Sequence, residues 1–514
     1  MADVSPYSTI EPLITSTQSY LAPLEAQRVA SYDLYDAIYW NVPETFKIKQ
    51  RGTDADPVYI PSGRIIADTT NRYTAADFGF TAAEGTDAEN LELTTQLNAL
   101  FRRERFFSRF AANKLDGIIR GDWCWHIVGD LTKLPGRRLS ILPVHPGSVY
   151  KITALDNPDS VIGYDIIKIV VVGNDSFVQT QRYQKGQWVT PADFKRDAPD
   201  VGTIFSSVQL WKLDDWGSVD DQGIPDSSPE AMVIPTTPLH PFITALPVYH
   251  IPHNERTTQL YGNSELRGME RIMAALNQSI SDEELALALE GLGMYATTSG
   301  PPRDDQGNES NWVLGPGRVV ELDAVDGQSV KDMWDRIGGV GSVTPMQDHI
   351  KMLIEFLREG SGATDAAVGK VDVQVAESGI ALQLQLAPML AKVGGYDTTI
   401  TDVHRQMFFD LRAWLTVYEA IPVMNSLAVA EPTMGDKIPI NRKERFTEIM
   451  TMFTSKLVPA SWAAAELGKL GYVITAEDLG AVAEETAAMA AAGDPFAARA
   501  AQESEAEVEE GVAV

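Results

Sequence analysis

The sequence predicts an α+β protein in which N-terminal helices and an antiparallel β meander precede a series of long helices. From Trp123 to about Pro252, apolar and polar residues alternate with a period of two, which is typical of short strands. From Asn263 onward, apolar residues recur at spacings of three and four, as along one face of a helix. A chain of 514 residues is also long enough to divide into two or more parts with cores of their own.

Two helices are expected before the strands. In the first, residues 27–40, large apolar residues have helical spacing up to a break at Pro43. Its aromatic residues, in the run YDLYDAIYW, are expected in the core rather than in a platform for stacking nucleic-acid bases. The second is expected as one continuous helix that begins at residue 87 and ends near Gly117 to Gly121, with these apolar residues on one side: Leu93, Leu97, Leu100 and Phe107.

Short strands joined by tight turns make up the predicted meander. The alternating runs are WCWHIV, SVYKIT, YDIIKIVVV, FVQTQRYQ and TIFSSVQLWKL, with turn signals at Gly173 and Lys185. The single cysteine, Cys124, cannot form an intrachain disulfide, and its place in an alternating run predicts a buried thiol. The acidic, proline-bearing stretch at residues 214–238 is expected to be a surface loop.

The first long helix is expected to begin at Asn263 or Ser264, which would cap it, and to extend for roughly 40 Å to Glu290. Glu265 would then lie in its first turn, near the positive end of the helix dipole. Ser281 with Glu284 matches a capping box inside the run and predicts a kink. Five apolar residues follow spacings of three and four and form a seam that needs a partner: Leu266, Met269, Met273, Leu276 and Ile280.

A glycine- and proline-rich insert separates this helix from a second one. The insert has one strand candidate, RVVELD at residues 318–323, whereas VKDMWDRI at residues 330–337 does not have a strand pattern. The second helix is expected to begin with Thr344 as its cap and Pro345 in its first turn, and to stop at Gly360. The two helices therefore bracket a compact excursion of the chain.

A small, polar, glycine-bearing segment leads into a third long helix. This helix contains Pro388 and the pair Gly394 and Gly395, which are sources of kinks. Three shorter helices are expected from Asn441 onward, separated by Pro459 and Gly471. The tail at residues 494–514 is rich in Ala and Glu and is expected to be solvated and disordered.

Charge is the most informative bulk property of the chain. It has 42 Lys and Arg against 71 Asp and Glu, for a formal net charge of −29. This balance argues against a continuous basic surface that grips phosphates, although it leaves room for a local basic cluster. No stretch approaches the roughly 18 apolar residues of a membrane span, and no signal peptide is visible at the N-terminus. We expect a protein used in the cytosol or in something assembled there.

Two glycine-bearing runs resemble phosphate or dinucleotide sites, and both lack required residues. In GATDAAVGKV, Thr364 stands where the first glycine is required and Val371 where Ser or Thr would hold Mg²⁺. In GGVGSVT, Thr344 stands where a dinucleotide fingerprint needs its third glycine. Neither run therefore predicts a nucleotide site.

The remaining chemical patterns do not predict catalysis either. His250, His253 and Glu255 suggest a metal site, but Pro252 interrupts the strand and no further His or Cys completes a ligand set, so structural hydrogen bonds are expected instead. No G-x-S-x-G nucleophile elbow occurs, and Cys124 has no evident catalytic partners. We therefore expect no enzyme, no catalytic residue, no metal and no cofactor.

Four stretches, taken in their order along the chain, resemble the portal proteins of tailed bacteriophages of the siphophage type. They are YDLYDAIYWN, IIRGDWCWHIV, IPHNERTTQLYGNSELRGMERIMAALNQSISD and VAESGIALQLQLAP. The third places a strand ending in His-x-x-Asn before the long helix, and the fourth opens the helix that contains Pro388. The resemblance covers about residues 27–419.

The resemblance implies a portal-like fold and a ring, commonly of twelve copies, at one vertex of a capsid. It divides the chain into a wing (residues 1–262), a first stem helix (263–291), a clip (292–343), a second stem helix (344–360), a tunnel loop (361–378), a kinked spine helix (379–425), a crown (426–493) and the acidic tail. Double-stranded DNA would pass through this ring during packaging and ejection. The implied partners are other copies of the chain, the major capsid protein and scaffold, the terminase large subunit and a head-tail connector protein.

The resemblance also suggests which side chains face DNA or partners in the virion, whose capsid would be assembled in the host cytoplasm. In the tunnel loop they are Thr364, Asp365, Lys370, Asp372 and Gln374, and on the second stem helix Lys351, Glu355 and Arg358. The docking surface of the clip would contain Arg303, Asp304, Asp305, Asn311, Trp312 and Arg318. Twelve copies at −29 would carry about −348 formal charges, so the ring would repel phosphates and hold DNA only weakly.

Two other classes of protein are compatible with the sequence. One is an acidic hydrolase with a β-rich domain and a helical lid, which would need a pocket of convergent groups with perturbed pKa values. The other is a different structural protein of a phage head. A closed ring of about twelve subunits would distinguish the portal-like protein from a monomeric hydrolase.

Overall fold

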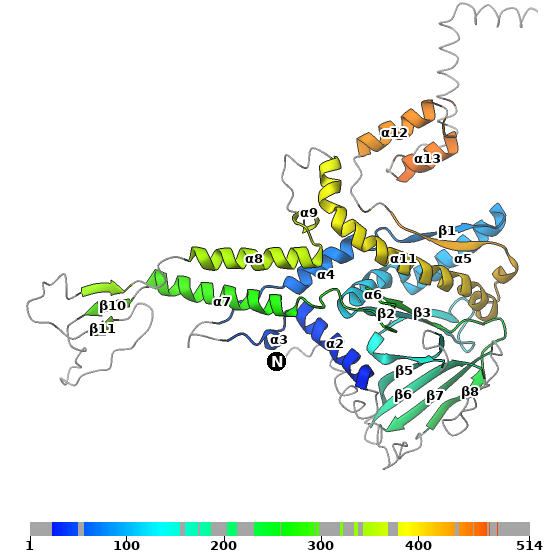
Figure 1. Cartoon of the computed structure of the whole chain (residues 1–514). Helices are drawn as coiled ribbons and strands as arrows, with labels where there is room; N and C mark the ends of the chain where they lie inside the picture. The colour runs from blue at the N-terminus through cyan, green and yellow to red at the C-terminus, as the bar shows by residue number, and fades with distance from the viewer. Residues whose placement is uncertain are drawn as a thin grey trace, which may run out of the picture. The chain divides into compact units, whose positions relative to one another are not determined.

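The computed structural model has the mixed helices and antiparallel sheets that the sequence predicts (Figure 1). It describes residues 23–49, 56–154, 160–172, 175–186, 203–212, 231–257, 259–292, 294–297, 319–321, 334–337, 343–368, 379–435, 437, 442–455, 457–469, 472, 478 and 481. By its internal contacts the chain divides into two compact units, Met1–Gly435 and Asp436–Val514. None of the described helices has the length and apolar character that crossing a membrane requires.

The N-terminal part of the first unit is helical. Its helices are α2 (Pro23–Tyr39), α3 (Pro43–Phe46), α4 (Ser62–Tyr73), α5 (Asp87–Glu104) and α6 (Phe106–Arg120). The aromatic residues of α2 lie in the core, as predicted, except for Trp40 just after the helix, which is exposed. A capping box begins α5, where Thr86 accepts from the backbone N–H of Glu89 and the Glu89 carboxylate accepts from that of Thr86.

The prediction of one continuous helix from residue 87 to Gly121 is wrong, because the chain breaks at Arg105. This residue has φ of 53°, in the left-handed region, and it ends α5 and precedes α6. The break changes the phase of the apolar pattern. Leu93, Leu97 and Leu100 are buried as expected, but Phe106 is buried in place of Phe107, which is 40% exposed. A left-handed residue inside an otherwise helical pattern carries no signal in residue periodicity.

Five antiparallel strands follow one another in chain order, which confirms the predicted meander. They are β4 (Val149–Thr153), β5 (Val161–Val172), β6 (Asp175–Lys185), β7 (Ile204–Lys212) and β8 (Ala231–Pro238). The last strand lies within the stretch predicted to be a surface loop, so that prediction is wrong for residues 231–238, while residues 213–230 lie outside the described ranges. The edge position of β8 tolerates its two prolines, because an edge strand has unpaired backbone positions.

A separate three-stranded sheet, in the order β3-β2-β9, was not distinguished from the meander by sequence. Its strands are β2 (Asp122–Gly129), β3 (Leu139–Val144) and β9 (Val248–Pro252). The first six residues of the central strand β2 are all buried, including Cys124, as predicted. A two-stranded pair is formed by β1 (Gly79–Ala83) and β13 (Val429–Thr433). The short 3-10 helix η1 (Pro146–Ser148) precedes β4.

Two antiparallel helices, α7 (Glu270–Leu292) and α8 (Thr344–Ser361), form a hairpin in which they lie side by side (Figure 1). Between them the chain forms β10 (Met294–Thr297), β11 (Val319–Glu321) and β12 (Trp334–Ile337), ordered β11-β10-β12. The strand candidate at residues 318–323 is therefore confirmed for Val319–Glu321, and its other residues lie outside the described ranges. The interpretation of residues 330–337 as non-strand is wrong for Trp334–Ile337. These residues form a strand because they pair with β10, although their side chains do not alternate as in a typical strand.

Four predicted details of the helical hairpin are also wrong, and one of them is the cap of α8, which is Val343 rather than Thr344. The helix α7 begins at Glu270 rather than near Asn263, and Gly268 before it has φ of +89°. It continues unbroken through Ser281, whose hydroxyl donates to the Asn277 carbonyl and accepts from the backbone N–H of Val58, so no internal cap forms. The end of α8 is Ser361, and the left-handed residue that terminates it is Gly362 rather than Gly360.

The predicted seam is nevertheless buried. Leu266 and Met269, which precede α7, and Met273 and Leu276 within it belong to one core cluster, against which Ile280 packs. Side chains from α2, α4, α6 and α8 complete the cluster. The apolar spacing therefore identified which side chains are buried, although it did not identify where the helix begins.

The first unit ends with α9 (Asp365–Val368), the 40-residue helix α11 (Gly379–Tyr418) and the 3-10 helix η3 (Val423–Asn425) before β13. Pro388 lies inside α11, and Figure 1 shows a bend along this helix. The second unit contains α12 (Arg442–Thr454) and α13 (Ala460–Lys469), which agree with two of the three predicted C-terminal helices. The third predicted helix and the acidic tail lie almost entirely outside the described residues.

Candidate functional site

The candidate site is the α7–α8 hairpin together with the residues that fix its base, because most of the described residues expected to face DNA lie on α8. Lys351 and Glu355 lie on the exposed side of α8, and Arg358 lies in its last turn. The Lys351 ammonium is 3.2 Å from the carboxylate of Asp348 one turn earlier, and both side chains are well exposed. Such an exposed pair contributes little to stability and leaves the cation accessible.

The segment that follows the end of α8 contains the first residues of the expected tunnel loop. Thr364 accepts a hydrogen bond from the backbone N–H of Ala367 at 3.3 Å, and Asp365 is the first residue of α9. The other tunnel-loop residues, Lys370, Asp372 and Gln374, lie outside the described ranges. So do all of the residues expected on the clip docking surface: Arg303, Asp304, Asp305, Asn311, Trp312 and Arg318.

The outer surface of α8 has two chemically different sides. Ile350, Leu353 and Leu357 are buried against the rest of the core cluster. At 100° per residue, Lys351 and Glu355 lie to one side of this buried stripe, and Met352 and Phe356 lie to the other. Met352 is 40% exposed and Phe356 is 48% exposed. The described chain therefore leaves a polar side and an apolar side of the same helix in contact with solvent.

The Asp122 cluster fixes the chain segment that leads into α7. The buried Asp122 carboxylate accepts from the Tyr32 hydroxyl at 2.5 Å and from the backbone N–H of Gly262 at 2.8 Å, and it lies 2.6 Å from Nε2 of His250. Burial by itself would raise the pKa of Asp122, but the hydrogen bonds, that of His250 foremost, hold this pKa below its usual value. The carboxylate is therefore charged and joins α2, β9 and the lead-in to α7.

Arg28 closes the Asp122 cluster from α2. Its guanidinium donates to the Tyr32 hydroxyl and to the carbonyl oxygens of Pro146 and Val149, at 3.0 to 3.2 Å. It also lies 4.0 Å from the centre of the Tyr261 ring, which is a cation–π distance. The cluster thus holds one buried cation and one buried anion in the same network.

The Glu265 cluster joins the base of the hairpin to α11. The buried Glu265 carboxylate receives a hydrogen bond from the Tyr396 hydroxyl at 3.1 Å and lies 3.2 Å from Nε2 of His253. The Lys392 ammonium donates both to Glu265 and to the carbonyl oxygen of Ser361, the last residue of α8. Burial raises the pKa of Glu265, but His253 and then Lys392 outweigh it and the net pKa is lowered. Glu265 and Lys392 together therefore connect the residue after β9, the lead-in to α7, the end of α8 and α11.

Sequence reasoning missed both clusters except for their histidines. The expectation that His250 and His253 form structural hydrogen bonds is confirmed, since each is bonded to a carboxylate. No group of three metal-ligating side chains occurs in the part of the chain that the structure describes. The role expected for Glu265 in a helical first turn is wrong, because it precedes the helix and pairs with Lys392. The partners Asp122 and Lys392 are too distant in sequence to be recognised.

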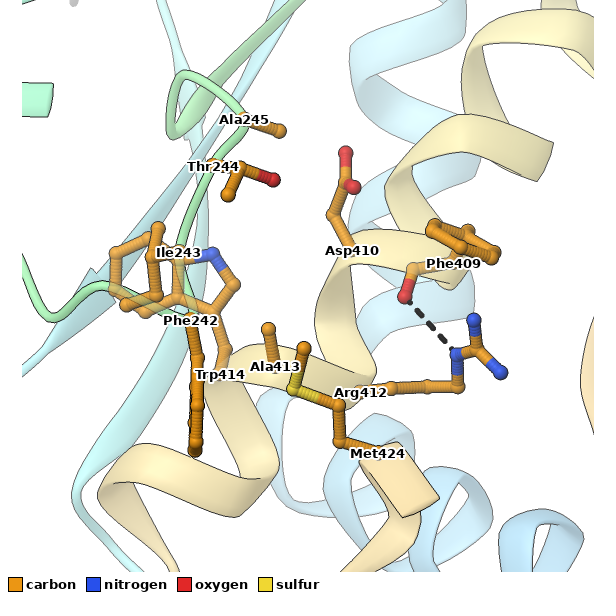
Figure 2. A pocket seen from close by; sticks show the side chains of 10 residues that line it. All are labelled: Phe242, Ile243, Thr244, Ala245, Phe409, Asp410, Arg412, Ala413, Trp414 and Met424. Atoms are coloured by element: carbon orange, nitrogen blue, oxygen red, sulfur yellow. Dashed lines mark hydrogen bonds between the residues drawn. The ribbon is translucent and has the colours of Figure 1, made fainter. Parts of the chain in front are cut away.

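A cavity of about 230 Å³ lies between the segment before β9 and the C-terminal half of α11 (Figure 2). Phe242 and Met424 are among its lining residues, and Thr244 and Asp410 lie on opposite sides of it. Burial raises the pKa of Asp410, but its carboxylate already accepts from the Tyr249 hydroxyl and the Gln406 amide. Asp410 is the one acidic residue in the lining, and a cavity of this size is smaller than most small-molecule sites.

Comparisons with known proteins give similarity only at the level of solved structures. No protein-family model and no curated protein matches the sequence. A chain in the neck of the native GTA particle, computed with C12 symmetry, has 13% sequence identity and a TM-score of 0.38, and the match covers 81% of this chain and 96% of that one. A chain in the neck of the empty GTA particle, computed with C6 symmetry, has 13% identity and a TM-score of 0.40, covering 81% and 97%. Both scores lie below the level at which a shared fold is established.

Proposed function

We propose that this chain is the subunit of a portal-like ring through which double-stranded DNA is packaged into a capsid and later ejected. The observation that carries the proposal is the order of elements around the hairpin. The buried His253 follows the strand β9 directly, a fixed lead-in comes next, and α7 and α8 then bracket a small three-stranded sheet before the long α11. The sequence stretches that resemble portal proteins lie at these positions: the end of β9, the lead-in to α7 and the start of α11.

The two exposed sides of α8 support the ring. Met352 and Phe356 leave apolar surface that a neighbouring subunit would remove from water, at about 25 cal/mol per Å². Lys351 and Glu355 on the other side of the helix would remain solvated and line the channel. The net charge of −29 per copy would make the channel repel phosphates, so that DNA passes without adhering.

The proposed role assigns no chemistry to this chain. ATP hydrolysis would belong to the terminase large subunit, which would dock on the segment between α7 and α8 and later be replaced by a head-tail connector protein. The major capsid protein and scaffold would surround the ring in the virion. The hydrolase alternative has no specific support among the described residues, because the cavity at Asp410 offers no second acid and its carboxylate is already hydrogen-bonded.

Mass measurement under native conditions tests this proposal, with electron images of the same sample viewed down the symmetry axis. We expect a closed ring of about twelve subunits with an open channel. A substitution of Phe356 by serine should shift the population toward smaller species, whereas Glu355→Gln, one residue away on the polar side, should leave the ring intact. A stable monomer of the unmodified chain, or a monomer that hydrolyses a substrate, would contradict the proposal.

A further inference from the structure

A group of basic side chains is concentrated at one place on the first unit, although the chain as a whole is strongly acidic. They come from the α5–α6 junction and from the loop between β2 and β3, and we call them the basic patch: Arg102, Arg103, Arg105, Arg109, Lys133, Arg137 and Arg138. The guanidinium of Arg103 joins the two segments by donating to the carbonyl oxygens of Gly136 and Leu139. Arg109 donates in the same way to Ile141 at 2.8 Å. The patch is therefore a single surface built from two segments.

Some cations of the basic patch are committed to the fold and others are available. Arg103, Arg109 and Arg138 bind backbone carbonyls, and they account for the contacts that hold the loop in place. Arg102, Arg105 and Arg137 are exposed and form no ion pair with any residue that the structure describes. Lys133 is exposed and forms an ion pair with Asp130 at 3.8 Å. Three cations, all of them arginines, are thus free to contact a partner.

The other acids near the basic patch do not neutralise the three free arginines. Glu419 is buried, and its carboxylate accepts from the backbone N–H groups of Gly136, Arg138 and Leu139. Glu104 lies within 3.5 Å of the guanidinium groups of Arg103 and Arg109. Both carboxylates are therefore occupied by the structural contacts of the patch, which leaves its outer surface positive.

Large apolar side chains lie among the exposed cations. Leu131 is 60% exposed and Leu134 is 73% exposed, and both are on the loop that carries Lys133 and Arg137. A patch that needed only to be soluble would not require two well-exposed leucines. Exposed apolar groups rimmed by charge are typical of surfaces that bind another polypeptide.

From this combination we infer that the basic patch binds a short acidic segment of a partner protein, with the carboxylates meeting the free arginines and apolar side chains meeting Leu131 and Leu134. Screening explains the preference for a short segment. At physiological ionic strength charges act over about 8 Å, so a short ligand experiences the patch alone. A DNA duplex or an anionic membrane extends beyond it and also meets the rest of a chain of net charge −29. The inference does not depend on the proposed portal function.

Fluorescence anisotropy with labelled probes tests the inference on the full chain. The probes are an acidic peptide of about 15 residues that carries Glu and Leu at helical spacing, a peptide of equal charge without Leu, and a short DNA duplex. Vesicles containing phosphatidylserine form a separate arm, measured by co-sedimentation. We expect the Glu and Leu peptide to bind at least about tenfold more tightly than the other probes, and its affinity to fall with added salt.

Two triple variants make the test specific. In one, Arg102→Glu, Arg105→Glu and Arg137→Glu reverse the free cations, and peptide affinity should fall by at least about tenfold. In the other, Lys49→Glu, Arg72→Glu and Lys168→Glu make the same charge change at exposed positions outside the patch, and affinity should change by less than about twofold. Substitution of Leu131 and Leu134 by serine should remove the advantage of the leucine-bearing peptide.

Three outcomes would overturn the inference. Tighter binding of the duplex or the vesicles would identify a phosphate surface instead. Equal loss of affinity in both triple variants would show that only net charge matters. A change in the subunit number of the patch variant, measured by native mass, would show that the patch is a contact between copies. If the chain forms no ring at all, the portal proposal fails and the peptide result is still interpretable.

Discussion

The aromatic core around His404 and the α7–α8 hairpin both bury apolar side chains, but the core is covered on all sides within the chain and the hairpin is covered only in part. Around His404 the rings of Phe106, Phe110, Trp123 and Trp125 pack at centroid distances of 5.3 to 6.5 Å, with elements on every side. On α8, one stripe is buried and the apolar side next to it, containing Met352 and Phe356, is exposed. The core is complete within one chain. The hairpin is complete only if another surface covers it.

The largest expected effect is therefore in the aromatic core. Trp125→Ala removes a fully buried ring and its indole N–H bond to Nε2 of His404, which is 3.1 Å long. We expect a loss of about 3–5 kcal/mol in the free energy of unfolding, measured by urea denaturation. Phe356→Ala on the hairpin should cost less than about 1 kcal/mol in the same monomer measurement. Similar losses in the two variants would show that α8 is already covered within the chain.

A substitution at the base of the hairpin should lower the free energy of unfolding nearly as much as one in the core, and more than one on the exposed surface of α8. Lys392→Met leaves the Glu265 carboxylate buried without its cation, and it also removes the donor to Ser361. Removing one partner of a buried pair costs about 3 kcal/mol, so the unfolding free energy should fall by that order. Lys351→Met, the matched change on the exposed surface, should have an effect within about 0.5 kcal/mol. Hydrogen exchange at residues 361–368 should accelerate only in the first variant.

Acid should weaken the core before it weakens the hairpin base. Burial lowers the pKa of His404 to about 4, and its geometry fits the neutral ring, with Nδ1–H donating to the Ile400 carbonyl and Nε2 accepting from Trp125. Unfolded histidine binds a proton near pH 6.5, so between about pH 6.5 and 4 the unfolded state holds more protons than the folded state. The free energy of unfolding therefore decreases as the pH is lowered through this range. His404→Gln should reduce this slope by about 1.4 kcal/mol per pH unit, read from urea titrations at several pH values.

The lowered pKa of Glu265 acts in a different pH window. Its carboxylate contributes stability that is present above its unfolded pKa of about 4.5 and is lost as pH falls through the lower folded value. Above about pH 5, the unfolding free energy of Glu265→Gln should therefore have nearly the same pH slope as that of the unmodified protein. Below about pH 5, the variant should lose less unfolding free energy than the unmodified protein as the pH falls. A changed slope between pH 5 and 7 would place the titrating group elsewhere.

The smallest effect on the monomer is expected at the apolar side of α8, where the comparison between the two regions is most informative. Phe356→Ser should leave the unfolding free energy of dilute protein within about 0.5 kcal/mol of the unmodified value. Its subunit number should nevertheless fall in native mass spectra, because the serine removes apolar surface between copies. If monomer stability fell strongly while the subunit number stayed the same, the exposed stripe would have a role within the chain.

Local signals in the sequence accounted for many elements and for which apolar residues are buried. Period-two alternation located four of the five strands of the meander, and the spacing of Leu266, Met269, Met273 and Leu276 identified residues that all lie in one core cluster. These predictions succeed because burial of alternate or every third and fourth side chain is imposed by backbone geometry and appears within a short window. The resemblance to portal proteins rests on the same windows.

Boundaries and partnerships were decided only by the tertiary structure. Arg105 breaks a helical pattern with a left-handed residue, and β8 and β12 become strands because partner strands are available to them. Most importantly, Asp122 meets His250 and Glu265 meets Lys392 across 128 and 127 residues of sequence. No local pattern encodes such pairs, because a carboxylate is compatible with solvent or with burial until a cation is brought beside it. Residue spacing thus determined what this chain buries, and the fold determined which charges are buried with it.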